Sequence, residues 1–183
     1  MARALILHQL LGTRISDLLY LKQDCISKID GKYVISIYQT KTGKTYRKPV
    51  TEDIKNIIDA SIRFTCENYG ASSYVFADSK NPEKPMSANK VSYHLRKMIY
   101  ENDLRDDKGE MFTASTHIFR RNFGKKLVEL NIDDEKIAKL LGHSGTSSVN
   151  NYRKLSNESL AKQTKKVRDD IDKMIRMTYK EGV

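Results

Sequence analysis

The sequence predicts a mainly α-helical domain with a small three-stranded antiparallel β-sheet near its N-terminus. Apolar residues recur at helical spacing along most of the chain, and the period changes to two only between residues 24 and 50. A length of 183 residues with only 3 Pro and 9 Gly argues against long linkers and suits one domain with a real core. We therefore expect residues 1–183 to form a single domain.

The first two helices are predicted at the very start of the chain. Residues 2–11 are an apolar helical stretch, the chain turns at Gly12, and the following threonine can cap a second helix over residues 14–21. Arg14 then lies at a helix start beside a turn. Asp17 follows three residues later on the same face, so it either orients Arg14 by a charge-assisted hydrogen bond or is a solvated helix acid.

Alternating apolar and polar residues predict a three-stranded antiparallel sheet, with strands over residues 25–29, 33–38 and 45–50. Asp30-Gly31 between the first two strands is typical of a type I′ turn. The second hairpin turns at Thr42-Gly43 and has Lys41 at its tip. A lysine at such a tip is most often simply solvated.

Two amphipathic helices are predicted in the middle of the chain. Thr51 caps the first, which runs to about residue 69 and stops at Gly70, and Ser87 caps the second, which runs to about residue 101. Helical spacing places these side chains on their buried faces: Ile54, Ile57, Ile58, Ile62 and Phe64 in the first, and Val91, Leu95, Met98 and Ile99 in the second.

A helix beginning near residue 117 carries a histidine and an arginine on one face. Ser115 or Thr116 would cap it, placing His117 in the first turn, where unpaired backbone N–H groups favour an anion. Arg120 lies three residues further on the same face, and Gly124 stands one turn beyond it, where a neighbour can approach closely. We expect the opposite face to be the buried one, through Phe119, Phe123, Leu127 and Leu130.

The next segment brings a second histidine and a tyrosine to the end of short helices. Asp133 caps a helix over about residues 134–141, Gly142 ends it in a left-handed conformation, and His143 follows directly. Tyr152 lies on a further helical piece, nine residues after His143. Helix ends and tight turns would bring two histidines, an arginine and a tyrosine together, and this combination predicts a phosphate-binding site.

These motifs resemble those of the tyrosine recombinase (phage integrase) family. The chain has H-x-x-R at 117–120, then L-L-G-H, then a tyrosine nine residues later. Upstream, T-R-I-S-D-L at 13–18 resembles the first arginine box of the family, and Q-T-K-T-G at 39–43 its hairpin lysine. The resemblance implies the catalytic domain of such a protein, with the N-terminal core-binding domain absent from this chain.

The resemblance implies a site-specific DNA recombinase, integrase or transposase. Tyr152 would attack a DNA phosphodiester, giving a 3′-phosphotyrosyl link and a free 5′-hydroxyl, and strand exchange would follow. Arg14 and Arg120 would clamp the non-bridging phosphate oxygens, since planar guanidinium groups bind bidentately and keep their charge. One departure concerns Asn150 and Asn151, which stand where relatives often carry an apolar residue. We therefore expect the tyrosine helix to dock loosely.

The remaining catalytic roles fall to a lysine and two histidines. Lys41 would protonate the leaving 5′ oxygen as a general acid, with Lys44 as the alternative. His117 would assist proton transfer to or from the tyrosine, and His143 would hydrogen-bond a phosphate oxygen. Three further cations are expected to contact DNA: Lys44, Arg121 and Arg153.

A formal net charge of +10 indicates a polyanionic partner, with nucleic acid favoured over an anionic membrane surface. The resemblance implies double-stranded DNA, a homo-oligomer (tetramer) on DNA, no cofactor and no metal. No apolar run reaches the roughly 18 residues of a membrane span, and the two distant cysteines, Cys25 and Cys66, suit a reducing compartment. We expect a cytoplasmic protein of bacterial or phage origin that is associated with the nucleoid.

The last helix carries one apolar stripe, formed by Leu160, Thr164, Val167, Ile171, Met174 and Thr178. This stripe either packs on its own domain or docks into a neighbouring protomer, as the C-terminal segment of similar recombinases does. Two other functions stay open. A type IB topoisomerase uses a related constellation but more often carries lysine where His117 stands, and a non-catalytic DNA-binding helical protein would not need Tyr152.

Overall fold

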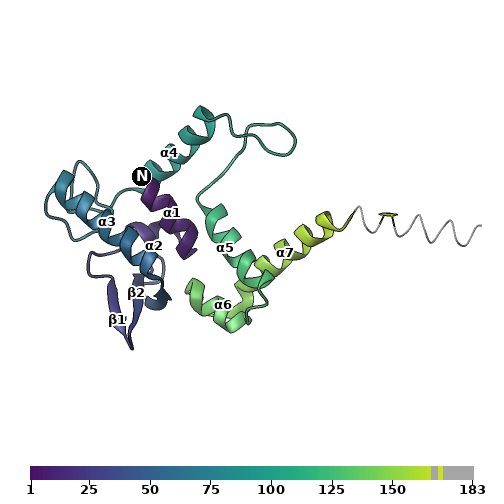
Figure 1. Ribbon diagram of the computed structural model, residues 1–183, viewed down its shortest axis with the longest axis horizontal. Coiled ribbons are helices and arrows are strands. Elements are labelled where there is room, and N and C mark those ends of the chain that lie inside the picture. Colours follow the sequence, from purple (N-terminus) through teal and green to yellow (C-terminus); the bar gives the residue numbers. More distant parts are fainter. Residues whose placement is uncertain (166–168, 171–183) are drawn as a thin grey trace, which may run out of the picture.

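The fold is mainly helical with one small antiparallel sheet, which confirms the predicted class (Figure 1). The structure is a computed structural model and describes residues 1–165, 169 and 170. Its elements in chain order are α1 (Ala2–Leu11), α2 (Ile15–Leu19), β1 (Ile26–Ile29), β2 (Lys32–Tyr38), β3 (Thr45–Val50), α3 (Glu52–Tyr69), α4 (Ala88–Glu101), α5 (His117–Glu129), α6 (Asp134–Leu141), a short 3₁₀ turn η1 (Thr146–Ser148) and α7 (Val149–Gln163).

The N-terminal part of the chain packs α1 to α4 and the sheet around one hydrophobic core. The strands lie in the order β1-β2-β3, and both neighbouring pairs are antiparallel. Ile35 and Ile37 of β2 are fully buried, as the alternation predicts. The β1–β2 turn has positive φ at both central residues, 47° at Asp30 and 76° at Gly31, which confirms the predicted turn.

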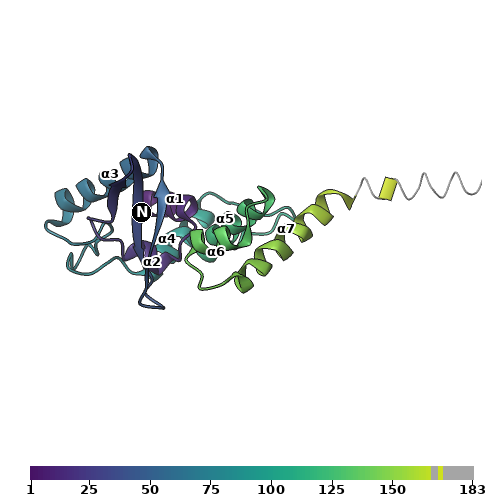
Figure 2. The same ribbon diagram turned by 90° about the horizontal axis from the view of Figure 1, so that it is seen from below.

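The C-terminal helices form a second, smaller core. Its fully buried members are Ile137, Leu141 and Val149, and the ring of Tyr152 is part of it. Helix α5 lies between α1 and α7, so it joins the two cores (Figure 1). Helix α7 leads away from the sheet, beyond α5 and α6 (Figure 2).

Three of the predicted helix caps are confirmed and two are wrong. The side chains of Thr51, Ser87 and Asp133 accept hydrogen bonds from the first turns of α3, α4 and α6. Thr116 makes no such bond, because it is already helical with φ −59° and ψ −19°. Ser115 instead accepts the N–H of the third residue on through its backbone carbonyl. Thr13 does not cap α2, because Arg14 occupies the N-cap position and the buried hydroxyl of Thr13 has no hydrogen-bond partner among the described residues.

The predicted buried face of α5 is only partly confirmed. Phe119, Phe123 and Leu127 are half-buried, and the last two pack against the second core. The most deeply buried residues of this helix are Arg120, Gly124 and Val128, whereas Leu130, directly after the helix, is 69% exposed. The reason is that α5 is covered on two sides, by α1 and by α7, so that the face carrying the arginine lies inside. Two other side chains predicted as buried are exposed, because α3 and α4 bury only a narrow stripe: Phe64 and Met98.

The predicted C-terminal stripe is only partly within the described residues. Leu160 is 59% exposed. Thr164 is the C-cap residue of α7, and its hydroxyl donates a hydrogen bond to the carbonyl of Leu160. The other members of the stripe lie outside the described residues: Val167, Ile171, Met174 and Thr178. In the part of the chain that the structure covers, no helix combines the length and apolar character that a membrane crossing requires.

Candidate active site

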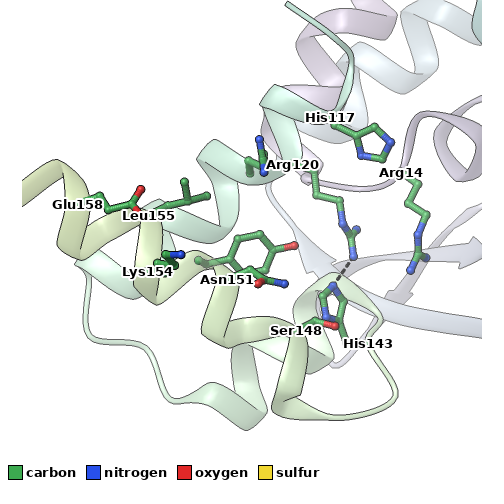
Figure 3. A pocket seen from close by; sticks show the side chains of 11 residues that line it. Arg14, His117, Arg120, His143, Ser148, Asn151, Lys154, Leu155 and Glu158 are labelled. Carbon is green, nitrogen blue, oxygen red and sulfur yellow. Dashed lines mark hydrogen bonds between the residues drawn. The ribbon is translucent and has the colours of Figure 1, made fainter.

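One cavity of about 620 Å³ brings together side chains from the α1–α2 turn, α5, the end of α6 and α7. Five of the six predicted catalytic residues line it: Arg14, His117, Arg120, His143 and Tyr152. Figure 3 shows the two arginines and the two histidines gathered at one end of this cavity, with Lys154, Leu155 and Glu158 of α7 at the other. The two guanidinium groups therefore face one space, as the predicted clamp on a phosphate would require.

Arg120 is held by three segments that are distant in sequence. It is only 6% exposed, and its Nη1 donates to the carbonyl of Gly12 at 3.0 Å. Its Nη2 donates to the carbonyl of Leu141 at 2.8 Å and lies 2.6 Å from Nε2 of His143. Burial lowers the pKa of Arg120, which the nearby Tyr152 opposes, but an arginine stays charged in proteins. The site therefore has a fixed cation at its centre.

His143 is placed by the left-handed end of α6. Gly142 has φ 65°, and the histidine side chain then turns towards Arg120 (Figure 3). Burial first, and then the charges of Arg120 and Arg14, lower the pKa of His143 to about 4, so the ring is neutral at pH 7. Because Nε2 faces an Arg120 N–H, it acts as acceptor and the ring proton lies on Nδ1. That Nδ1 is buried and has no partner among the described residues.

Tyr152 is docked against α5, so the expectation of a loose tyrosine helix is wrong. Its side chain is 7% exposed, and its ring lies directly over Gly124, where an added Cβ would be 2.7 Å from Cγ and Cδ1. Val149, fully buried one turn earlier, seats the helix instead of the exposed Asn150 and Asn151. The ring centroids of Tyr152 and His143 are 6.1 Å apart.

Asp17 connects Arg14 to the β2–β3 hairpin. Arg14 caps α2 in an extended conformation, and its Nη1 lies 3.4 Å from Oδ2 of Asp17. The other carboxylate oxygen accepts from both the backbone N–H and the hydroxyl of Thr40, each at 3.1 Å. Asp17 is 1% exposed, so it is not a solvated helix acid.

The structure does not bring Lys41 into the cavity. Its side chain is exposed and makes no hydrogen bond within the described residues. The base of the hairpin is fixed, because Gln39 Nε2 donates to the carbonyl of Gly142 at 2.5 Å, but this contact does not orient the tip. Lys44, the alternative, lines an adjoining cavity of about 420 Å³ that also contains Arg14 and His143.

The two other cations expected to contact DNA differ in their surroundings. Arg121 is exposed and lines the main cavity beside Arg120. Arg153 does not line it, since its guanidinium is bound to Asp134 through Nη2 at 2.5 Å and Nε at 3.0 Å. Lys154, the next residue, lines the cavity instead.

Two buried basic residues near the site were missed in the sequence. Lys48 of β3 is 5% exposed, and burial, with a smaller effect of Arg120, lowers its pKa to about 7. The signal was present, because strand alternation places Lys48 on the same inward face as Tyr46 and Val50. His8 of α1 is 1% exposed, with a pKa lowered to about 4 mainly by burial. It lies one turn after the buried Ala4, on the apolar face of the helix.

Comparisons with known proteins show the family of this chain. The sequence matches the phage integrase family over residues 2–159. Transposase B from transposon Tn554 of Staphylococcus aureus (strain Mu50) is 25% identical over 161 residues, which are 87% of this chain and 25% of that protein. Tyrosine recombinase XerA of Thermococcus kodakarensis is 25% identical over 158 residues, 86% of this chain and 51% of that protein. The chain therefore spans between a quarter and about half of these relatives.

Solved structures confirm the tyrosine recombinase catalytic fold. The XerH site-specific recombinase in its post-cleavage complex with difH substrate has a TM-score of 0.69 and 17% identity, covering 88% of this chain and 44% of that chain. A lambda integrase tetramer bound to a Holliday junction has a TM-score of 0.60 and 24% identity, covering 82% of this chain and 41% of that one. With its motifs, its fold and a family match over most of its length in agreement, this chain belongs to the phage integrase family of tyrosine recombinases.

Proposed function

We propose that this chain is the catalytic domain of a site-specific DNA recombinase or transposase in which Tyr152 is the nucleophile. The observation that carries the proposal is the shared cavity, in which two arginines, two histidines and this tyrosine surround one space. The chain spans only part of its relatives, so the activity of the complete protein belongs to the proposal.

The reaction exchanges one phosphoester bond for another. The phenolic oxygen of Tyr152 forms a bond to phosphorus, and the bond between phosphorus and the 5′ oxygen of the DNA breaks. The phenol proton passes to a base, for which His117 is placed at the cavity wall, and the departing oxygen takes a proton from a lysine. Because the phosphotyrosyl link keeps the phosphoester, a 5′-hydroxyl from another strand can reverse the step and complete an exchange.

Arg14 and Arg120 stabilise the charge that builds up at phosphorus. Arg120 is already fixed by two carbonyls, so it loses little freedom when the phosphate arrives. A bound phosphate would also oppose the two positive charges that lower the pKa of His143. His143 would then gain a proton and donate to a phosphate oxygen, the role expected for it.

The partner is double-stranded DNA. A net charge of +10, with Arg121 and Lys154 at the cavity, supports binding through backbone phosphates. Such binding by this chain is weak, nonspecific and salt-sensitive. The functional assembly is a tetramer on DNA, supported by the lambda integrase tetramer on a Holliday junction, and the C-terminal segment after α7 is the candidate for exchange between protomers.

Covalent trapping tests the nucleophile. The probe is a pool of nicked duplexes with random sequence around the nick, from which a short 5′-hydroxyl strand dissociates after attack so that the adduct persists. We expect an adduct whose digested peptide carries the nucleotide on Tyr152. Tyr152→Phe removes the adduct and keeps DNA binding, because only the hydroxyl is lost.

The matched control is Tyr100→Phe, which alters a tyrosine of α4 that is 74% exposed and does not line the cavity. It is expected to form adducts like the unsubstituted chain. Adducts that persist in Tyr152→Phe, or that map to another tyrosine, would overturn the assignment.

A further inference from the structure

The turn between α1 and α2 presents three consecutive backbone carbonyls to three buried side chains. The carbonyl of Leu11 accepts from Nζ of Lys48, that of Gly12 from Nη1 of Arg120 at 3.0 Å, and that of Thr13 lies 3.0 Å from Nε2 of His8. The three side chains come from β3, α5 and α1 and are at most 6% exposed. The turn is therefore fixed from three directions immediately before Arg14.

Close packing leaves this turn little room to shift. Gly12 has φ 59°, and a Cβ at this position would lie 2.4 Å from Cδ1 of Phe123. Nζ of Lys48 lies 5.3 Å from the centroid of the same ring, within the range of a cation–π contact. The lysine thus touches both the carbonyl before Gly12 and the ring that covers it.

We propose that Lys48 and His8 are positioning residues: they hold the Gly12 turn in the conformation in which Arg14 and Arg120 face one phosphate. The inference rests on the proposed function. Neither residue lines the cavity, so both act through the turn. Lys48 and His8 fix the carbonyls on either side of the one that holds Arg120, and the last of the three belongs to the residue before Arg14.

Burying the amino group of Lys48 costs free energy of folding that an apolar side chain would not. A role in packing alone therefore does not explain a lysine at this position. Its strand neighbours on the inward face are Tyr46 and Val50, and its cross-strand partner is the fully buried Ile35. An apolar side chain of similar length would fill the same space without burying an ammonium group. If Lys48 served packing alone, Lys48→Met would leave catalysis unchanged.

The test compares Lys48→Met with Lys48→Gln, which keeps a donor for the carbonyl of Leu11 but carries no charge. We expect Lys48→Met to have an unchanged or higher Tm, a DNA Kd within about twofold of the original, and an adduct rate lower by about 10- to 100-fold. Lys48→Gln recovers part of the rate. Lys28→Met, an exposed lysine of β1, is the control for loss of one charge.

A double-mutant cycle with Arg14→Lys tests whether Lys48 acts through the arginine. If it does, Lys48→Met lowers the adduct rate much less in the Arg14→Lys background than in the original chain. Independent effects that multiply would overturn the proposal, as would a wild-type rate in Lys48→Met. His8→Phe, which keeps a ring but loses the donor to Thr13, is expected to behave like Lys48→Met in the same cycle.

A second readout does not depend on catalysis. The guanidinium nitrogens of Arg120 should give separate ¹⁵N NMR signals, because two carbonyls fix the group, and these signals should merge in Lys48→Met as the turn loosens. Unchanged Arg120 signals in Lys48→Met would overturn the positioning role even if no adducts form in any variant. Loss of adducts in the unsubstituted chain alone would instead count against the proposed function.

Discussion

Gly124→Ala is expected to displace Tyr152, the proposed nucleophile, while leaving the fold intact. The added Cβ would lie 2.7 Å from Cγ and Cδ1 of Tyr152 and 2.9 Å from Cδ2. Contacts between carbon atoms are favourable only at about 3.5–4.0 Å, so the tyrosine ring has to move away by roughly 1 Å. A misplacement of this size can lower a rate by about 100-fold.

The effect on stability should be much smaller than the effect on cleavage. Overpacking costs about 1–3 kcal/mol, whereas alanine in a helix interior is more stable than glycine by about 1 kcal/mol. The net loss is then about 0–2 kcal/mol, which lowers the Tm by at most about 8 °C in a chain of this size. Thermal unfolding followed by circular dichroism measures this term, and covalent trapping on nicked DNA measures the rate.

Gly145→Ala is the matched control, because an added Cβ there meets no atom within 4 Å and the backbone is extended at φ −167°. It should change neither the Tm nor the adduct rate. Cleavage by Gly124→Ala at the original rate, or an equal loss in both variants, would refute the reasoning that the glycine exists to seat the tyrosine.

Three further predictions concern the proposed general acid, the buried Lys48, and Asp17, which connects Arg14 to the β2–β3 hairpin. Lys41 and Lys44 are the two lysines proposed as general acid. Alanine at the lysine that has this role should slow cleavage of ordinary DNA but not of DNA with sulfur at the scissile 5′ position, since sulfur leaves without a proton. If sulfur restores the rate of neither variant, neither lysine is the general acid. The pKa of Lys48 is about 7 in the folded chain, against an ordinary value of 10.5. Between pH 7 and 10.5 the unfolded chain therefore binds a proton that the folded chain has lost. The free energy of unfolding then rises with pH by up to about 1.4 kcal/mol per pH unit. Urea denaturation at pH 7 to 9 should show this rise in the original chain but not in Lys48→Met. If the free energies of unfolding of the two chains change with pH in parallel, the prediction is wrong. Asp17→Asn keeps an acceptor for Thr40 but removes the anion beside Arg14, so adduct formation should slow while the Tm changes by only a few degrees; an unchanged rate would show that the carboxylate charge does not matter.

Features set by near neighbours in the chain were predicted well. The Asp30-Gly31 turn, the cap at Asp133 and the left-handed Gly142 before His143 depend on residue types a few positions apart, and the structure has each of them. The close approach of a neighbour at Gly124 was also predicted, because glycine has no side chain and lies one turn beyond Arg120. What the sequence left unnamed was the group that approaches it, the ring of Tyr152.

Burial of polar groups was the main failure, and the cause is physical. Hydrophobic spacing assumes that apolar faces turn inward, but a charged side chain can be buried wherever distant backbone groups satisfy it. Arg120 and Lys48 are buried because carbonyls far away in the chain accept their hydrogen bonds. The exposed positions of Leu130 and Phe64 also did not follow from their spacing, because spacing does not show how much of each helix the neighbouring elements cover.

The sequence by itself determined which residue types are present, in what order, and on which local turn or helix end each one lies. That was enough to predict the fold class and the chemistry that the chain's motifs resemble. Only the tertiary structure decided that α5 lies between α1 and α7, so that Arg14, Arg120 and Tyr152 open onto one cavity while Lys41 stays outside it. Convergence of this kind depends on contacts between segments far apart in the chain, which local pattern does not encode.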